Sequence, residues 1–226
     1  MKKVSCIIIA YKSSRFHQAL LKSLYQQTQK PFEIIFIDNE GSLETQNFCK
    51  KNKLVYFSTG NIGYGQACNY GAKNAKGDYL LFLNPDLILQ DNLLEKLAKS
   101  YTHSTGLVSC FVKTYDGKTI TNDFGKVDNL GRPIRCSKND NQLVNGCTVF
   151  CSKNIFSTLG GFSKNFFMYG EDTDLALKTL KLNKTNKVID TTSVWHYGGG
   201  SQENKYQKIP HVLKSIFLIY IKHKLK

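Results

Sequence analysis

The stretch VSCIIIA, residues 4–10, indicates the fold class most clearly. It is a continuous apolar run rich in β-branched residues, which is typical of a parallel strand covered on both faces. The run is too short for the apolar segment of a signal peptide, and Lys12 and Arg15 follow at once. We therefore expect a buried first strand here and no leader.

Working outward from this strand, apolar residues alternate between strand-like and helix-like spacing. Expected strands lie at residues 33–37, 54–57 and 78–83, and expected helices at 15–27, 45–51 and 93–101. Alternation with short connections predicts an α/β fold with a mainly parallel open sheet flanked by helices. In such sheets ligands bind at the carboxyl ends of the strands, where Tyr11, Asp38 and Asp86 fall.

The second half of the chain is less regular and predicts a smaller mixed region. Expected strands lie at 107–112, 148–151 and 188–189, a polar surface excursion at 114–142 and a helix at 173–182. We divide the chain into residues 1–104, 105–204 and a basic C-terminal helix at 205–226, within one domain overall.

Composition narrows the partners. The 226 residues are 41% hydrophobic, enough for a substantial core, and the net charge of +14 favours phosphorylated substrates, an acidic membrane or nucleic acid as the partner.

The cysteines are odd in number and form no CxxC pair, so we expect reduced thiols in a cytoplasmic protein. They are Cys6, Cys49, Cys68, Cys110, Cys136, Cys147 and Cys151.

Asn84-Pro85-Asp86 follows the expected strand at 78–83. A carboxylate just past a buried strand can hold Mg²⁺ or Mn²⁺ against a diphosphate, because hard oxygen ligands suit these ions. The alternative is a proline-stiffened turn in which Asp86 caps the next helix, and the tripeptide alone favours that alternative.

Gly170-Glu171-Asp172-Thr173-Asp174 places three acids at an expected helix start. One of them could act as general base toward an acceptor hydroxyl. Ordinary compensation of the helix dipole explains them equally well. The aromatic run at 166–169 directly before them favours a pocket wall.

Two glycine-rich segments give weaker indications. His196 precedes three glycines, in a loop that could place its imidazole on a metal, although a hydrogen-bonded core histidine is the commoner case. Residues 61–71 resemble a phosphate-binding turn into a helix but lack both the GxGxxG and the GK[ST] pattern. A tight strand-to-helix turn is the alternative.

In this order, the four segments resemble the family 2 inverting glycosyltransferases with the GT-A fold, in particular the bacterial rhamnosyltransferase and galactofuranosyltransferase branch. The resemblance covers nearly the whole chain, and its most specific part is the run from Gly160-Gly161-Phe162 to Gly170-Glu171-Asp172. It implies a metal-dependent glycosyltransferase that uses Mn²⁺ or Mg²⁺, with an acceptor-side region at 105–204.

The resemblance also implies a role for each matching residue. Asp172 would be the catalytic base and His196 would join Asp86 on the metal. Asn84 replaces the first Asp of the family's DxD motif, which puts the number of metal ligands in question. Glu171 and Trp195 would lie on the acceptor side. Donor-binding residues would be Ala10, Tyr11, Asp38, Asn61, Asn84 and Asp86.

The implied reaction moves a sugar from a UDP- or dTDP-activated donor to a hydroxyl on a surface polysaccharide or lipid-linked glycan. The attack is a direct displacement, so the anomeric configuration inverts and no cysteine needs a role. The alternative enzyme is a nucleotidyltransferase acting on sugar phosphates, which would release pyrophosphate. The interpretation as a nucleic-acid-binding module is based on the net charge alone, and no nucleic-acid-binding motif supports it.

The C-terminal tail leaves two interpretations open. Residues 205–226 contain six lysines and no acidic residue, around an apolar run at 212–221 that is too short to span a bilayer. The tail is either an amphipathic helix lying on an anionic membrane or a final helix packed on the domain. The first interpretation would place the protein at the inner face of the cytoplasmic membrane.

Overall fold

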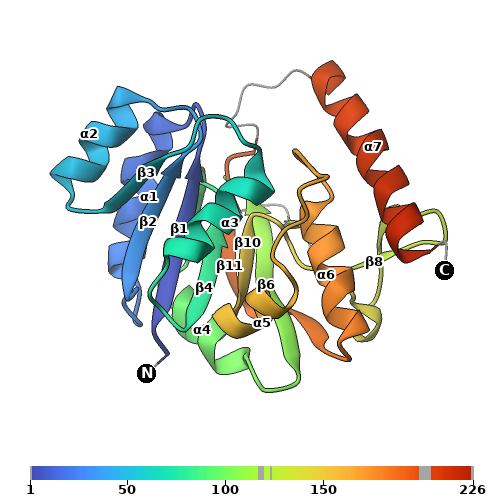
Figure 1. The fold of residues 1–226 in the computed structure, drawn as a ribbon. Helices are drawn as coiled ribbons and strands as arrows, with labels where there is room; N and C mark the ends of the chain where they lie inside the picture. Colours follow the sequence, from blue (N-terminus) through green and yellow to red (C-terminus); the bar gives the residue numbers. More distant parts are fainter. Residues whose placement is uncertain (1, 117–119, 123, 199–204, 225–226) are drawn as a thin grey trace.

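The computed structural model describes residues 2–116, 120–122, 124–198 and 205–224. Within these residues the main sheet has nine strands in the order β3-β2-β1-β4-β10-β6-β11-β5, with β7 paired to β6 (Figure 1). The bounds are β1 Val4–Ala10, β2 Glu33–Asp38, β3 Val55–Ser58, β4 Tyr79–Leu83, β5 Leu87–Leu89, β6 Thr105–Thr114, β7 Ile120–Asn122, β10 Thr148–Ser152 and β11 Thr185–His196.

The first four strands are parallel to one another, as the alternating sequence predicted. β1 pairs in parallel with both β2 and β4, and β2 pairs in parallel with β3. β10 then runs antiparallel between β4 and β6, and β11 is parallel to β6. The expected α/β fold with a mainly parallel sheet is confirmed.

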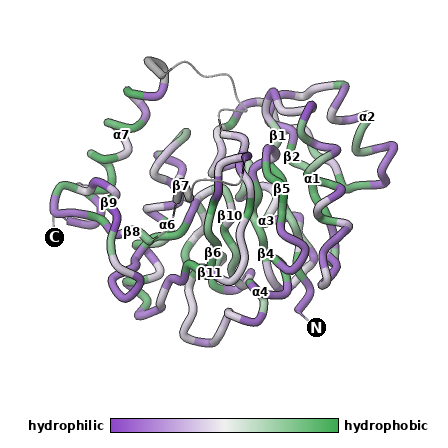
Figure 2. The backbone as a smooth tube through the Cα atoms, turned by 180° about the vertical axis from the view of Figure 1, so that it is seen from behind, coloured by the Kyte–Doolittle hydropathy of each residue, from purple (hydrophilic) through white to green (hydrophobic). Residues whose placement is uncertain are grey.

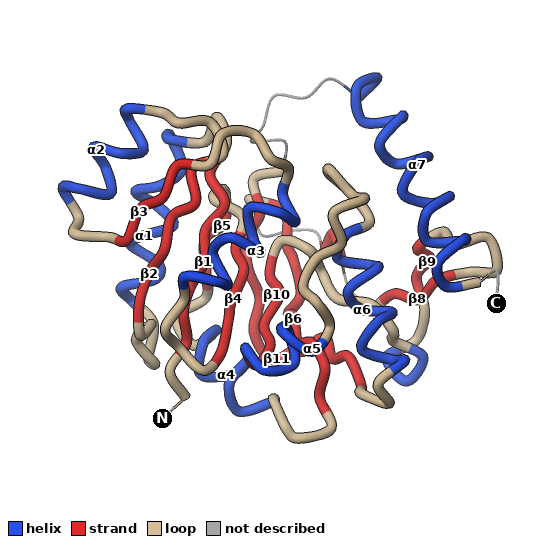
Figure 3. The backbone as a smooth tube through the Cα atoms, viewed as in Figure 1, coloured by secondary structure: helices blue, strands red, loops and turns tan. Residues whose placement is uncertain are grey.

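Helices cover both faces of the sheet (Figure 3). One hydrophobic cluster joins the sheet to α1, α2 and α4, and the other joins it to α3, α5, α6 and α7. The bounds are α1 Ser14–Gln26, α2 Leu43–Lys51, α3 Tyr64–Asn74, α4 Leu93–Ser100, α5 Lys153–Thr158, α6 Glu171–Lys181 and α7 Lys205–His223.

β1 shows why its sequence is apolar throughout. Cys6 and Ile8 belong to one cluster, while Ile7 and Ile9 belong to the other. Successive strand residues point to opposite faces, so a strand buried on both faces has no polar alternation. The tube view shows the apolar colour concentrated in the central strands of the sheet (Figure 2). All cysteines except Cys136 are buried.

The second half departs from the sequence expectations in three places. The expected short strand at 188–189 is the twelve-residue strand β11. The helix expected from residue 173 begins two residues earlier, at Glu171, so Glu171 does not precede it. The polar excursion holds a small hairpin, β8 Gly125–Val127 and β9 Pro133–Arg135. Polar composition hid these elements because their stability comes from tertiary packing.

The C-terminal helix α7 stands beside α6 at the edge of the molecule (Figure 1). Ile219 of α7 is 1% exposed, and the Ser215 hydroxyl donates to the Tyr169 carbonyl. Its last turn brings Lys222 Nζ and His223 Nε2 to 2.7 and 2.8 Å from Asp174 Oδ1. The helix therefore packs on the domain, and none of the described helices is long and apolar enough to cross a bilayer.

Candidate active site

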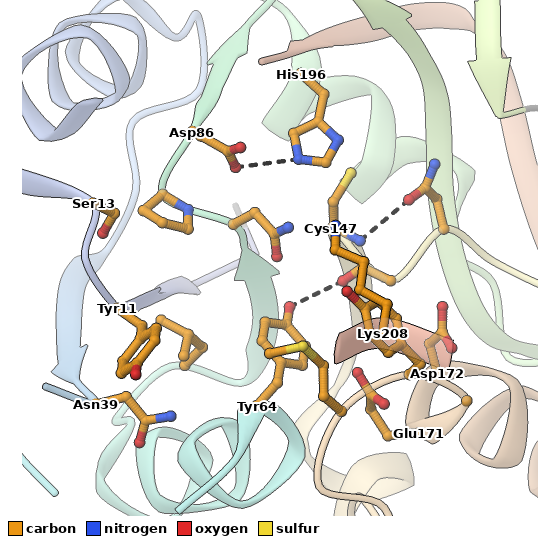
Figure 4. A pocket seen from close by; sticks show the side chains of 18 of the residues that line it. Tyr11, Ser13, Asn39, Tyr64, Asp86, Cys147, Glu171, Asp172, His196 and Lys208 are labelled. Atoms are coloured by element: carbon orange, nitrogen blue, oxygen red, sulfur yellow. Dashed lines mark hydrogen bonds and ion pairs between the residues drawn. The ribbon is translucent and has the colours of Figure 1, made fainter. Parts of the chain in front are cut away.

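A cavity of about 440 Å³ opens at the carboxyl ends of β1 and β4. Figure 4 shows side chains from distant parts of the sequence pointing into it. Seven of the residues expected from the sequence line it, namely Tyr11, Asn61, Asn84, Asp86, Glu171, Asp172 and His196. One cavity thus gathers carboxylates, amides and an imidazole from both halves of the chain.

Asp86 and His196 lie side by side because of strand pairing. β5 follows Asp86 directly, and its first residue Leu87 is the register partner of His196 at the end of β11. His196 Nε2 is 3.2 Å from Asp86 Oδ1, and the Asp86 side chain is only 6% exposed. His196 is therefore the last residue of a strand, where the sequence suggested a loop. Gly199, Gly200 and Ser201 of that motif lie outside the described residues.

Glu171 and Asp172 lie in the first turn of α6, directly after a backbone turn at Tyr169 and Gly170. Tyr169 and Gly170 both have positive φ, 67° and 82°, and a non-glycine residue rarely adopts this conformation. This turn orients the chain so that both carboxyl side chains line the cavity. Such strain is common at functional sites.

The two carboxyl groups have different surroundings. Burial, together with the neighbouring Asp172, raises the pKa of Glu171 to about 8, and its Oε2 has no hydrogen-bond partner among the described residues. Burial also raises the pKa of Asp172, but the Thr173 backbone N–H donates to its Oδ1 at 2.7 Å and favours the ionised form. Glu171 is therefore protonated at neutral pH, and Asp172 is the better candidate for a proton acceptor.

Gly146 packs directly against Asp172. A Cβ atom at this position would lie 2.5 Å from Asp172 Oδ2, closer than real Cβ contacts allow. The Tyr64 hydroxyl donates to the Gly146 carbonyl at 2.9 Å. Tyr64, at the start of α3, therefore fixes the loop that contacts Asp172.

The glycine-rich segment 61–71 does not leave an open anion site at the start of α3. The backbone of Phe167 occupies that position. The Tyr64 N–H donates to the Phe167 carbonyl, and a Cβ on Gly63 would lie 2.5 Å from that same oxygen. Further along α3, the Asn69 side chain bonds both the N–H and the carbonyl of Phe162. The segment is thus a tight turn that anchors the chain leading to Glu171.

Three of the expected site residues do not line the cavity. The Asp38 carboxylate, fully buried, accepts the backbone N–H groups of residues 40, 41 and 42 and the Tyr56 hydroxyl. Ala10 is buried at the end of β1, where its carbonyl accepts the Asn39 N–H. Trp195 pairs with Ile88 across the sheet. Asp38 therefore organises the loop beside the cavity, and Trp195 stays at the β11–β5 ladder.

Several lining residues were missed by the sequence reasoning, among them Ser13, Asn39, Tyr64, Gly146 and Lys208. Asn39 directly follows Asp38, and its Oδ1 accepts the Ile62 N–H at 3.2 Å, so it links the β2 loop to the segment that carries Asn61. Lys208 belongs to α7 and brings a positive charge to the cavity from the far end of the sequence. Only tertiary packing reveals it.

The residues at the mouth of β4 fit a divalent ion. Among the described residues no group of three or more His, Cys, Asp or Glu converges as a metal cluster, but Asp86 and His196 form an adjacent pair. A carboxylate suits Mn²⁺ and Mg²⁺, and a neutral imidazole is a common metal ligand. Two neighbouring ligands about 2.1 Å from an octahedral ion lie about 3 Å apart, close to the 3.2 Å between Oδ1 and Nε2. The remaining positions would be open to phosphate oxygens and water.

The structure combines an α/β fold with a polar cavity at the carboxyl edge of the sheet, and comparison with known proteins gives the family. Residues 5–159 match the model of glycosyl transferase family 2, so the chain belongs to that family. An uncharacterized glycosyltransferase of Rickettsia typhi, RT0329, is 30% identical over 195 residues, covering 80% of this chain and 59% of the relative. The rhamnosyltransferase WbbL of Escherichia coli is 29% identical, covering 91% of this chain and 87% of the relative.

Solved structures confirm the GT-A-like fold. The mannosyltransferase PcManGT from Pyrobaculum calidifontis, solved with GDP-Man and Mn²⁺, has a TM-score of 0.72 at 15% identity, covering 98% of this chain and 64% of that chain. TarS of S. aureus has a TM-score of 0.66 at 20% identity, covering 86% and 36%. The chain spans 59% of the first Rickettsia relative and 35% of the next two.

Proposed function

We propose that this chain is an inverting, metal-dependent glycosyltransferase that moves a hexosyl or rhamnosyl group from a UDP- or dTDP-activated donor to an acceptor hydroxyl. The supporting observation is one cavity lined by the Asp86–His196 pair and by the Glu171–Asp172 pair. Relatives named as a rhamnosyltransferase and as a glucosyltransferase acting on a diphosphoundecaprenol-linked sugar support this class. The acceptor is a surface polysaccharide or a lipid-linked glycan.

Asp172 is the proposed catalytic base. It accepts the proton of the acceptor hydroxyl as the oxygen attacks the anomeric carbon, and the bond to the diphosphate breaks in the same step. A base must be ionised before the reaction, and the N–H of Thr173 favours the ionised form of Asp172. Glu171, protonated at neutral pH, instead offers a hydrogen-bond donor to the acceptor.

A single displacement inverts the anomeric configuration and needs no enzyme nucleophile. Cys147 also lines the cavity, but burial raises the pKa of its thiol well above the ordinary value. A thiol is a poor nucleophile compared with a thiolate. Cys147 is therefore a packing residue in this mechanism.

Asp86 and His196 would hold Mn²⁺ or Mg²⁺, which neutralises charge on the departing diphosphate when bound. Tyr11, Asn61 and Asn84 would contact the donor from the β1, β3 and β4 ends of the cavity. In this division residues 1–104 provide most of the donor site, and residues 105–204 provide the base and His196.

Peripheral contact with an anionic membrane, at its cytoplasmic face, is the proposed location. α7 packs on α6 through one side, while Leu213 and Phe217 are each 62% exposed on another. Apolar side chains on a helix with several lysines and no acidic residue suit an anionic lipid surface.

Flotation with anionic liposomes tests the membrane contact. Phe217→Ser should reduce binding, and Leu43→Ser, at a 74% exposed position on α2, should not. Equal binding of both variants and the native protein would refute the membrane role.

Mass spectrometry of products tests the proposed reaction. The protein, incubated with a UDP- or dTDP-sugar, a panel of glycan and glycoside acceptors and Mn²⁺, should release the nucleoside diphosphate and add one sugar to an acceptor. Release of pyrophosphate from a nucleoside triphosphate and a sugar phosphate would identify a nucleotidyltransferase and contradict the proposal. Omission of the metal should abolish turnover if Asp86 and His196 act as ligands.

A further inference from the structure

A second cavity of about 360 Å³ adjoins the candidate active site. The two cavities share Tyr169, Gly170 and Asp172, so this segment is the wall between them. The proposed base therefore borders both spaces. A molecule that occupies the second cavity can extend to Asp172 from the side opposite the donor.

The walls of the second cavity are mostly apolar. They come from the β8–β9 hairpin, from the loop before β10 and from α7. Of the described lining residues, only Arg135 and Asp172 carry a charge. Its apolar lining includes Ile134, Leu143, Val144, Val212, Ile216 and Ile219.

Close packing holds the two walls at a fixed spacing. Gly131, in the turn between β8 and β9, has φ +80°, and a Cβ there would lie 3.0 Å from the Ile216 carbonyl oxygen and from the Tyr220 nitrogen of α7. Ser215 ties α7 to Tyr169 from the other direction. The hairpin and the helix thus contact each other at Gly131, beside the cavity that both of them line.

We infer that this cavity binds the apolar chain of a lipid-linked acceptor, whose sugar hydroxyl then lies at Asp172. The inference rests on the proposed function and adds the place and chemistry of the acceptor. A nucleotide donor is excluded as the occupant, because its phosphates and ribose would be desolvated against apolar walls. An unmodified glycan would leave its hydroxyl groups unpaired there for the same reason.

The outer face of α7 agrees with a lipid-borne occupant. Ile209, Leu213 and Phe217 follow one another at four-residue spacing and are 52%, 62% and 62% exposed. Val212 and Ile216, each next to one of these positions, line the cavity. The same helix therefore offers one apolar face to the surroundings and a neighbouring apolar face to the cavity, with no acidic residue to repel a lipid phosphate.

Isoleucine methyl NMR of the full chain tests the site with a defined probe, octyl β-glucoside below its micelle-forming concentration. Its alkyl chain should shift the methyl signals of Ile134, Ile216 and Ile219, whereas methyl β-glucoside should leave them unchanged. Ile209 and Ile221 are exposed on α7 outside the cavity and serve as internal controls. Shifts confined to these two, or no shifts, would overturn the inference.

A matched pair of variants on the hairpin gives the second readout. Ile134 is 41% exposed and lines the cavity, while Leu130 is 56% exposed and does not. Ile134→Gln should weaken octyl glucoside binding by about fivefold or more, because a polar amide then meets the alkyl chain. Leu130→Gln should leave it unchanged. Equal losses in both variants would contradict the assignment.

Calorimetry of UDP and dTDP with Mn²⁺ on the same native sample tests the proposed function separately from the role of the second cavity. Absence of nucleotide binding would overturn the proposed function and the acceptor assignment with it. Normal nucleotide binding without the expected methyl shifts would overturn only the inference about the second cavity.

Discussion

Glu171→Gln removes a buried carboxyl whose ionisation the fold opposes, so the variant should become more stable than the native protein as pH rises. Glu171 is 7% exposed, and burial raises its pKa from the ordinary 4.5 to about 8. Below pH 4.5 the group is protonated in both the folded and unfolded states. Between pH 4.5 and 8 only the unfolded state releases the proton, so stability falls across this interval.

The size of the effect follows from the difference between the two pKa values. At about 1.4 kcal/mol for each unit, the native protein loses roughly 3–5 kcal/mol between pH 4.5 and 9 through this one group. Gln is similar in shape and does not ionise, so the variant lacks that loss. For a chain of this length, 1 kcal/mol changes the melting temperature by about 2–4 °C.

Differential scanning fluorimetry at pH 5.5 and pH 9 measures the effect. The melting temperature of Glu171→Gln relative to the native protein should be higher at pH 9 than at pH 5.5, by about 5 °C or more. Glu40→Gln, at an exposed position, is the control and should show no such pH dependence. An equal difference at both pH values would refute the raised pKa, and with it the assignment of Glu171 as a neutral hydrogen-bond donor.

Three further predictions follow from the site and its support. His196→Ala should weaken the Mn²⁺ dependence of nucleotide binding, measured by calorimetry, with little change in melting temperature; the reverse pattern would identify a core histidine. Gly146→Ala places a Cβ against the Asp172 carboxylate, so transfer should fall by about 10²-fold while donor binding is kept. Asp174→Asn breaks a buried ion-pair cluster that includes Lys222 and should cost about 3–5 kcal/mol at pH 7 in denaturant titrations. The neighbouring cations lower the pKa of Asp174, so this difference should shrink as pH falls below about 4.

The parallel strands could be predicted from the sequence because their burial on both faces leaves a continuous apolar run. Residues 4–10 and 78–83 have this pattern, and the structure places strands there. Asn84 and Asp86 follow from the second run, since a polar residue after a buried strand falls at the sheet edge. The acids at 171–174 mark the start of α6 for a similarly local reason, the helix dipole.

The rest of the site depends on contacts that have no local pattern. Asp38 has the position expected of a donor-binding acid, yet three backbone N–H groups and Tyr56 occupy its oxygens. The Asp86–His196 pair depends on β5, a three-residue strand too short to give an alternation signal. Lys208 reaches the cavity only because α7 folds back onto α6.

The central claim, that Asp172 is the base, is tested most directly by the transfer rates of Glu171→Gln, Asp172→Asn and Asp174→Asn at saturating donor, at a temperature where all three are folded. Asp172→Asn should bind donor and metal normally and lose about 10² to 10⁴-fold in turnover, the usual contribution of a general base. Glu171→Gln should keep most of its activity. Asp174→Asn should be less stable than the native protein but keep most of its turnover while it is folded. Near-normal turnover in Asp172→Asn, with a large loss in either neighbour, would contradict the account.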